Sequence, residues 1–187
     1  MDRDMKIAAA FAVLVCLAGA TAIAQETHYG NWVVREWAIA SPSLETSRDG
    51  FTDTITQDPR ISLTLTSTDG KAQLVLFHQW SDLELYVKWN EYVDHAMAND
   101  GSHDTPVFVS IDGAPATRSN WRLSNSLQAT FYSRMVSQFV RQLLESDTLS
   151  VQVVPFGGDY VTHTFELAGL NEAIHVLDGH FDYTKAK

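Results

Sequence analysis

Apolar and polar residues alternate along much of the chain between positions 31 and 167, as they do in β-strands that bury one face. The clearest alternating runs are 61–65 and 72–78, which flank the dipeptide Asp69-Gly70. Asp-Gly between two such runs predicts a tight hairpin, because both turn residues need positive φ. A third run at 83–89 extends this hairpin into a three-stranded antiparallel meander.

Further strands follow the same pattern. They are expected at 31–39, 107–111, 149–153 and 160–167, with another short strand around Trp121 within 114–123. The polar segments 40–60 and 94–106 are expected to be loops, and residues 25–30 are expected to fray. About eight or nine strands with a turn roughly every ten residues predict a mainly β fold, either an antiparallel β-sandwich or a twisted sheet.

The segment 128–146 departs from this alternation. Two adjacent rows of apolar residues recur every four positions there, which predicts one amphipathic helix packed on the sheet. The rows are Phe131, Met135, Phe139 and Leu143, and Tyr132, Val136, Val140 and Leu144. Ser124, Asn125 and Ser126 offer oxygens that would cap the first turn of this helix, and Ser146 would end it. With a short capped helical turn at 171–177, the predicted class is mainly β (α+β).

The N-terminal residues 1–24 have the features of a secretory signal peptide. An apolar run at 7–18 is followed by Ala22-Ile23-Ala24, the pattern that signal peptidase cleaves. The run is too short to span a bilayer, which needs roughly 20 residues. Met5 is the expected start, because Lys6 then gives the segment a basic beginning. We therefore expect a periplasmic protein cleaved after Ala24, with residues 25–187 forming a single β-rich domain and a polar tail from about 178.

Composition narrows the chemistry of the mature chain. Cys16 lies inside the apolar run, so the expected mature protein has no cysteine and therefore no disulfide, catalytic thiol or Cys-ligated zinc. The net charge of −10 disfavours binding to nucleic acid, because phosphate contacts need clustered Lys and Arg. Hydrophobic residues make up 45% of the chain, enough for a sizeable core.

Metal ligands gather in one acidic loop. His95, Asp100, His103 and Asp104 place imidazole and carboxylate groups close together in sequence, and zinc or calcium accept such ligands. Their spacing matches no established ligand pattern, however, and acidic loop tips are common on soluble proteins. We therefore expect no metal and no cofactor. His163 is expected to lie in the core or at its edge and to be hydrogen-bonded.

Exposed aromatic residues are a second kind of candidate. Most of the five tryptophans are expected in the core, but Trp121 lies in a loop-rich stretch between Asn120 and Arg122. These three residues are the candidate binding residues, because an exposed ring can stack on a sugar or anchor a protein partner.

Motifs for the common enzyme mechanisms are absent from the sequence. There is no G-x-S-x-G for a serine hydrolase and no P-loop or G-x-G-x-x-G for a nucleotide. Carboxylate pairs such as Glu84 and Glu91 occur by chance in any acidic protein. The chain is therefore expected not to be an enzyme.

A series of short motifs occurs along the chain in an order that resembles a family of exported proteins. They are Ser41-Pro42 with Thr52-Asp53, Ile61-Ser62-Leu63-Thr64-Leu65, Val109-Ser110-Ile111-Asp112, Trp121-Arg122-Leu123-Ser124, Val153-Val154-Pro155-Phe156 and Phe165-Glu166-Leu167-Ala168-Gly169-Leu170-Asn171-Glu172-Ala173-Ile174. Over about residues 32–177 the chain resembles the type VI secretion-associated VasI/TagO-like periplasmic proteins. It is more distantly similar to the invasion-associated locus B family, and it lacks the cysteines of both. The resemblance implies an accessory envelope protein without established catalytic residues.

The functional hypothesis is an exported, non-enzymatic accessory protein that binds another envelope or secretion-system component. A glycan- or peptidoglycan-binding module using exposed aromatics is the first alternative, and a metal-dependent enzyme is the second. A flat apolar patch would favour the protein partner. The sequence leaves the identity of the partner and the oligomeric state open.

Overall fold

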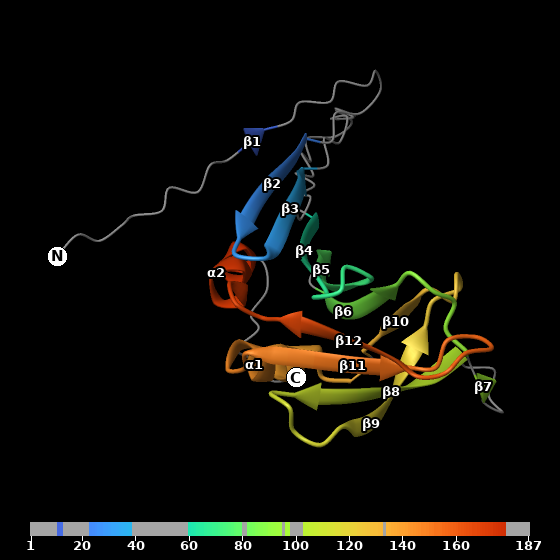
Figure 1. The fold of residues 1–187 in the computed structure, drawn as a ribbon. Coiled ribbons are helices and arrows are strands. Elements are labelled where there is room, and N and C mark those ends of the chain that lie inside the picture. The colour runs from blue at the N-terminus through green and yellow to red at the C-terminus, as the bar shows by residue number, and fades with distance from the viewer. Residues whose placement is uncertain are drawn as a thin grey trace, which may run out of the picture.

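The computed structural model describes residues 11–12, 23–38, 60–79, 82–94, 96–97, 103–132 and 134–178 (Figure 1). The strands are β1 (Phe11–Ala12), β2 (Ile23–Tyr29), β3 (Trp32–Ala38), β4 (Arg60–Thr66), β5 (Ala72–Gln79), β6 (Asp82–Trp89), β7 (Ala96–Met97), β8 (His103–Ile111), β9 (Thr117–Leu123), β10 (Ala129–Phe131), β11 (Thr148–Val153) and β12 (Val161–Glu166). The helical segments are α1 (Val136–Leu144), α2 (Leu170–Ile174) and the 3-10 turn η1 (His175–Leu177).

These strands form one open antiparallel sheet. Its order is β1-β2-β3-β4-β5-β6-β10-β9-β8-β11-β12, and β7 pairs with β8 beside this path. The predicted meander is confirmed, because β4, β5 and β6 pair in sequence with Leu63 opposite Leu76 and Leu76 opposite Leu85. The mainly β, antiparallel class predicted from alternation is therefore confirmed.

One face of the sheet forms the core, and the alternation in the sequence decides which. Leu63 and Leu74 are fully buried, whereas Thr64 and Gln73 beside them are half-exposed on the outer face. Full burial of a side chain as large as leucine contributes roughly 1.5–3 kcal/mol. A shift of one residue would move this whole set to solvent, so the buried leucines fix the register of the strands.

The short helix α2 packs against the hairpin formed by β2 and β3 (Figure 1). The indole nitrogen of Trp32, which is fully buried, donates a hydrogen bond to the carbonyl of Leu167 at 3.3 Å. Gly169 lies against the backbone of Tyr29 with φ of 92°, and a Cβ there would clash with the Tyr29 carbonyl. Glycine is required here both for the left-handed backbone and for the close approach.

The prediction of a helix over 128–146 is wrong in its extent. Residues 129–131 form β10, with Phe131 opposite Tyr86 of β6, and α1 begins only at Val136. Phe139, Val140 and Leu143 of α1 are buried. Apolar residues spaced four apart fit one face of a helix, but they also fit one face of a strand, whose side chains repeat every two residues. Pairing of residues 129–131 with β6 and β9 decides in favour of the strand.

The predicted helix cap also has a different role. The hydroxyl of Ser124 accepts hydrogen bonds from the backbone amides of Gln128 and Ala129, at 3.3 and 3.0 Å. It therefore closes the turn between β9 and β10, in which Leu127 has φ of 58°. The residue before α1 is Met135, which makes no side-chain cap.

At the N-terminus, the expectation that residues 25–30 fray is wrong. They belong to β2 and to the turn into β3, and the predicted strand at 31–39 is confirmed as β3. Phe11–Ala12, inside the predicted signal peptide, pairs with Gln25 and Glu26 of β2. The rest of the signal peptide before residue 23, and nearly all of the predicted loop at 40–60, lie outside the described residues. Within the described ranges, no helix is long and apolar enough to cross a membrane.

Candidate functional site

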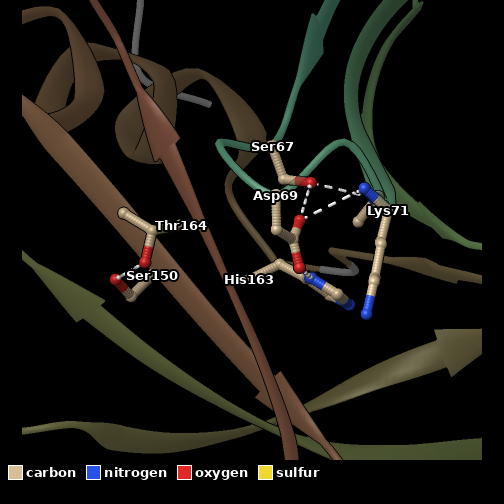
Figure 2. Close-up of polar contacts among 7 residues, drawn as sticks. Ser67, Asp69, Lys71, Ser150, His163 and Thr164 are labelled. Carbon is tan, nitrogen blue, oxygen red and sulfur yellow. Dashed lines mark hydrogen bonds and ion pairs between the residues drawn. The ribbon is translucent and has the colours of Figure 1, made fainter.

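A polar network joins the turn between β4 and β5 to the edge strand β12 (Figure 2). One carboxylate oxygen of Asp69 accepts hydrogen bonds from the Ser67 hydroxyl at 2.6 Å and from the Lys71 backbone amide at 3.1 Å. Its other oxygen lies 2.8 Å from Nδ1 of His163. Because an ionised carboxylate only accepts hydrogen bonds, Nδ1 of His163 carries the hydrogen. The sequence-based expectation of a hydrogen-bonded histidine at the core is confirmed, since His163 is 6% exposed.

This network fastens two distant parts of the chain. The Ser67 hydroxyl, followed by the other hydrogen bonds to the carboxylate, lowers the pKa of Asp69 from 3.8 to about 2. The backbone amide of Thr68 donates to the carbonyl of Thr164 at 2.9 Å, which holds the turn against β12. We call residues 67–71, together with His163, the turn latch.

The turn latch does not have the arrangement of a hydrolytic triad. In such a triad the histidine lies between the carboxylate and the hydroxyl, so that it can take the hydroxyl proton. Here Asp69 lies between Ser67 and His163, and the serine donates to the carboxylate (Figure 2). These hydrogen bonds join the β4–β5 turn to β12.

The predicted exposure of Trp121 is wrong. Trp121 is fully buried and contacts the rings of Tyr132 and Phe139 edge to face, at centroid distances of 5.4 and 6.5 Å. It lies in β9, where Trp121 and Leu123 point into the core and Arg122 between them points out. The short strand predicted around Trp121 is therefore confirmed as β9, and only the face that Trp121 occupies differs from the prediction.

Asn120 and Arg122 lie on the exposed side of β9, as their alternation with Trp121 requires. The guanidinium carbon of Arg122 lies 4.8 Å from the centroid of the Phe131 ring, and its Nη2 lies 3.6 Å from a carboxylate oxygen of Glu84. Arg122 is thus already engaged by an aromatic face and a carboxylate of its own sheet.

The predicted metal ligands are only partly described. His95 and Asp100 lie outside the described residues, whereas His103 and Asp104 are consecutive residues of β8. Asp104 is half-buried and pairs with Arg122 across the β8–β9 ladder. Among the residues that the structure describes, no group of three or more His, Cys, Asp or Glu side chains is arranged to hold a metal.

A set of exposed aromatic side chains lies elsewhere, on two loops. The exposed fractions are 61% for Tyr92, 74% for Phe156 and 58% for Tyr160. We call these three residues the aromatic loop surface. Together they expose on the order of 400 Å² of largely aromatic surface, since rings of this size present about 150–250 Å² each when fully accessible.

Backbone pairing places Tyr92 beside Phe156. The amide of Phe156 donates to the carbonyl of Tyr92 at 2.8 Å, and the amide of Asp94 donates to the carbonyl of Val154 at 2.9 Å. Between these bonds, Val93 and Pro155 form an antiparallel bridge and are both buried. Side chains alternate along paired strands, so Tyr92 and Phe156 lie opposite each other on the outer face, as do Asp94 and Val154.

Tyr160 belongs to the same outer face. Its ring contacts that of Phe108 edge to face, at a centroid distance of 5.8 Å. Phe108 pairs with Gln152 of β11, and Gln152 points outward because its neighbours Val151 and Val153 are buried. Side chains alternate between the two faces along 152–156, so Phe156 points to the same face as Gln152. The three exposed rings therefore share one end of one face of the sheet.

The backbone beneath the aromatic loop surface is fixed by its own contacts. Buried Val93 and Pro155 anchor the two loops, and a turn through Gly157 follows, with the amide of Gly158 donating to the carbonyl of Pro155 at 3.2 Å. The backbone that carries the rings is therefore held in place, which lowers the entropic cost of ordering the loops on binding.

Sequence reasoning missed this surface. The available signal was a large apolar residue within a turn, because Phe156 follows Pro155 and precedes two glycines. Tyr92 gave no signal of its own, because its exposure follows from pairing with a residue more than sixty positions away.

The structural class is a mainly β fold built on one antiparallel sheet. The chain is similar to the crystal structure of invasion associated protein B from Bartonella henselae, with a TM-score of 0.51 and 10% sequence identity. The match covers 82% of this chain and 95% of that protein. At this identity the likeness shows the fold alone. No protein-family model and no curated protein matches the chain.

Proposed function

We propose that this chain is an exported, non-enzymatic accessory protein that binds another protein of the cell envelope or of a secretion system through the aromatic loop surface. The observation that carries the proposal is the outward placement of Tyr92, Phe156 and Tyr160 on two loops anchored in the core. Large exposed aromatic rings lose water when covered, and Tyr and Trp are enriched among residues that dominate binding energy.

The size of the surface indicates the kind of interface. A stable interface buries about 800 Å² on each partner, and the exposed rings supply roughly half of that. They would form the centre of a small or transient contact, with the polar residues around them as its rim. The resemblance to VasI/TagO-like and invasion-associated locus B proteins supports an envelope location, and the predicted signal peptide supports export.

Site-specific photocrosslinking tests the proposal. A benzophenone amino acid replaces Phe156 in the exported protein, and a matched variant carries it at Gln138, an exposed position on α1. We expect position 156 to crosslink to a defined envelope protein and position 138 not to do so. The partner is then purified, and its affinity for the parent protein and for a Tyr92→Ala/Tyr160→Ala variant is measured.

The same variants separate the protein partner from the glycan alternative. Purified peptidoglycan sacculi are mixed with the parent protein and sedimented. Co-sedimentation that is lost in Tyr92→Ala/Tyr160→Ala, without a protein crosslink at position 156, would show that the rings stack on sugars and would overturn the proposal.

A further inference from the structure

The two ends of the described sheet are protected unequally. At one end, the turn latch meets the edge of β12 through the bond from the Thr68 amide to the Thr164 carbonyl. At the other end, β2 pairs with β3 along its whole length, whereas β1 pairs only with Gln25 and Glu26 on the outer side of β2. β1 lies within the predicted signal peptide, so cleavage after Ala24 removes it. In the mature chain, no described strand then pairs with the outer edge of β2.

The turn after β2 decides which backbone groups point to this edge. Tyr29 pairs with Trp32 across the two-residue turn Gly30-Asn31, whose glycine has φ of 58°. The pair that closes such a hairpin is hydrogen-bonded, and hydrogen-bonded and non-hydrogen-bonded pairs alternate along an antiparallel ladder. Tyr29 therefore directs its backbone groups toward β3, and the alternate residues Glu26 and His28 direct theirs outward.

This edge is complementary to itself. When two copies of β2 pair in antiparallel orientation around Thr27, Glu26 of each copy lies opposite His28 of the other. Both pairs then exchange N–H···O bonds through the groups that point outward. A register centred on Glu26 would instead place two carboxylates opposite each other, which destabilises a sheet. The residues of the edge thus favour one register of self-pairing.

The side chains on this edge do not need to be free for the pairing. Glu26 already contacts Arg35 of β3 at 2.8 Å and His28 of its own strand at 3.1 Å. Pairing brings the imidazole of the second copy to the end of this polar row, where it faces a carboxylate rather than a like charge. The backbone bonds, which use no side chain, carry most of the contact.

We propose that the outer edge of β2 in the mature protein pairs with the same edge of a second copy, forming a two-fold dimer with one continuous sheet. The paired strand is short, so the dimer is weak and its fraction rises with protein concentration. The net charge of −10 on each copy opposes the contact, and ordinary salt screens that repulsion. The inference goes beyond the proposed function, because this edge carries none of the three exposed rings.

A single engineered thiol tests the register. Thr27 meets itself on the two-fold axis in a non-hydrogen-bonded pair, whose Cα atoms lie about 4.5 Å apart, a separation that a disulfide accepts. Cys16 is the one cysteine of the chain and leaves with the signal peptide, so Thr27→Cys gives the mature protein one thiol. The exported variant, shown by its mass to begin at Gln25, is oxidised mildly near physiological salt. Thr162→Cys, exposed on β12 at the other edge, is the control.

We expect Thr27→Cys to form a disulfide-linked dimer at least about tenfold faster than Thr162→Cys, because pairing raises the effective concentration of its thiols. Adding His28→Pro should slow this at least about tenfold, since proline removes an amide hydrogen that each copy donates to the other. Proline is tolerated on an edge strand where the N–H points outward, and circular dichroism checks the fold. Sedimentation of the parent, without added cysteine, should show a dimer fraction that rises with concentration.

Several outcomes would overturn the inference. Equal rates for Thr27→Cys and Thr162→Cys would show chance collision of thiols, and a parent that stays monomeric at every concentration would exclude the dimer. An unchanged rate in folded His28→Pro would also refute the pairing. If that variant does not fold, His28→Glu replaces it and should slow the reaction by placing two carboxylates opposite each other.

Two further outcomes separate this inference from the proposed function. Retention of residues 1–24 in the exported protein would leave β1 on the edge and refute the dimer. A benzophenone amino acid at Thr27 that crosslinks in cells only to another envelope protein would show that a different chain occupies the edge. Loss of the crosslink at Phe156 bears on the proposed function alone, because Phe156 lies on another part of the sheet.

Discussion

Replacing Phe139 by alanine tests how α1 joins the core. Phe139 is 7% exposed, and its ring stacks on Tyr132 at a centroid distance of 4.6 Å and an interplanar angle of 22°. It also meets Trp121 edge to face at 6.5 Å and 83°. Phe139→Ala removes both ring contacts and leaves a cavity between α1 and β9.

The magnitude follows from these contacts. Truncation of a buried phenylalanine costs about 3–5 kcal/mol. We expect the lower end, about 3 kcal/mol, because α1 is only nine residues long and can move toward the cavity. With a urea m-value of about 2 kcal/mol/M, the midpoint of unfolding should fall by about 1.5 M. Gln138→Ala, the preceding and exposed position, should change the free energy of unfolding by less than about 0.5 kcal/mol.

Urea unfolding of the mature protein, followed by tryptophan fluorescence and by circular dichroism, measures both variants against the parent. Coincident transitions by the two probes would support two-state analysis. A loss below about 1 kcal/mol for Phe139→Ala, or equal losses for the two variants, would mean that the aromatic cluster around Trp121 does not hold α1 and would refute the reasoning.

Three further predictions concern the backbone, the turn latch and the N-terminus. Gly169→Ala should destabilise the protein by more than about 2 kcal/mol in thermal unfolding, because the new Cβ clashes with the Tyr29 carbonyl and the left-handed backbone is strained. Gly113→Ala is the control and should cost only about 1 kcal/mol, because Gly113 has a φ of 71° but open space around it. The pKa of Asp69 is lowered to about 2, so its ionised form stabilises the fold above about pH 4 and this contribution disappears as pH falls through 2. The difference in unfolding free energy between the parent and Asp69→Asn should therefore shrink from pH 5 toward pH 2 in urea titrations. A difference that stays constant over this range would contradict the stabilising role of the Asp69 charge. Intact-mass measurement of the exported protein should place its first residue at Gln25, and a retained residue 1–24 segment would show that the predicted cleavage is wrong.

The sequence predicted the strands where a single local pattern was present. Ile61 to Leu65 alternates over a full strand and is followed by Asp-Gly, so both the hairpin and its buried face could be predicted. The segment around Phe131 carries two patterns at once, and pairing with Tyr86 on a distant strand selects between them. Such a choice depends on tertiary contacts, which no local window contains.

The candidate binding residues show the same limit. Asn120 and Arg122 lie on the exposed face of β9, but Trp121 between them is buried. A short strand was predicted around Trp121, and its tertiary packing decides which face points to the core. The aromatic loop surface could not be predicted, since Phe156 and Tyr92 meet through a bridge between two segments that each resemble an ordinary turn.

The turn latch also bears on the solubility of the protein. In the described sheet, β12 is the last strand and pairs with β11 alone, and an unpaired strand edge is a template on which other chains can add strands. The Thr68 amide occupies the Thr164 carbonyl on that edge, and the Asp69 carboxylate stands beside it through its bond to His163. A backbone group and a negative charge thus obstruct the approach of a second chain. Opening of the latch would expose this edge to the strands of a second chain.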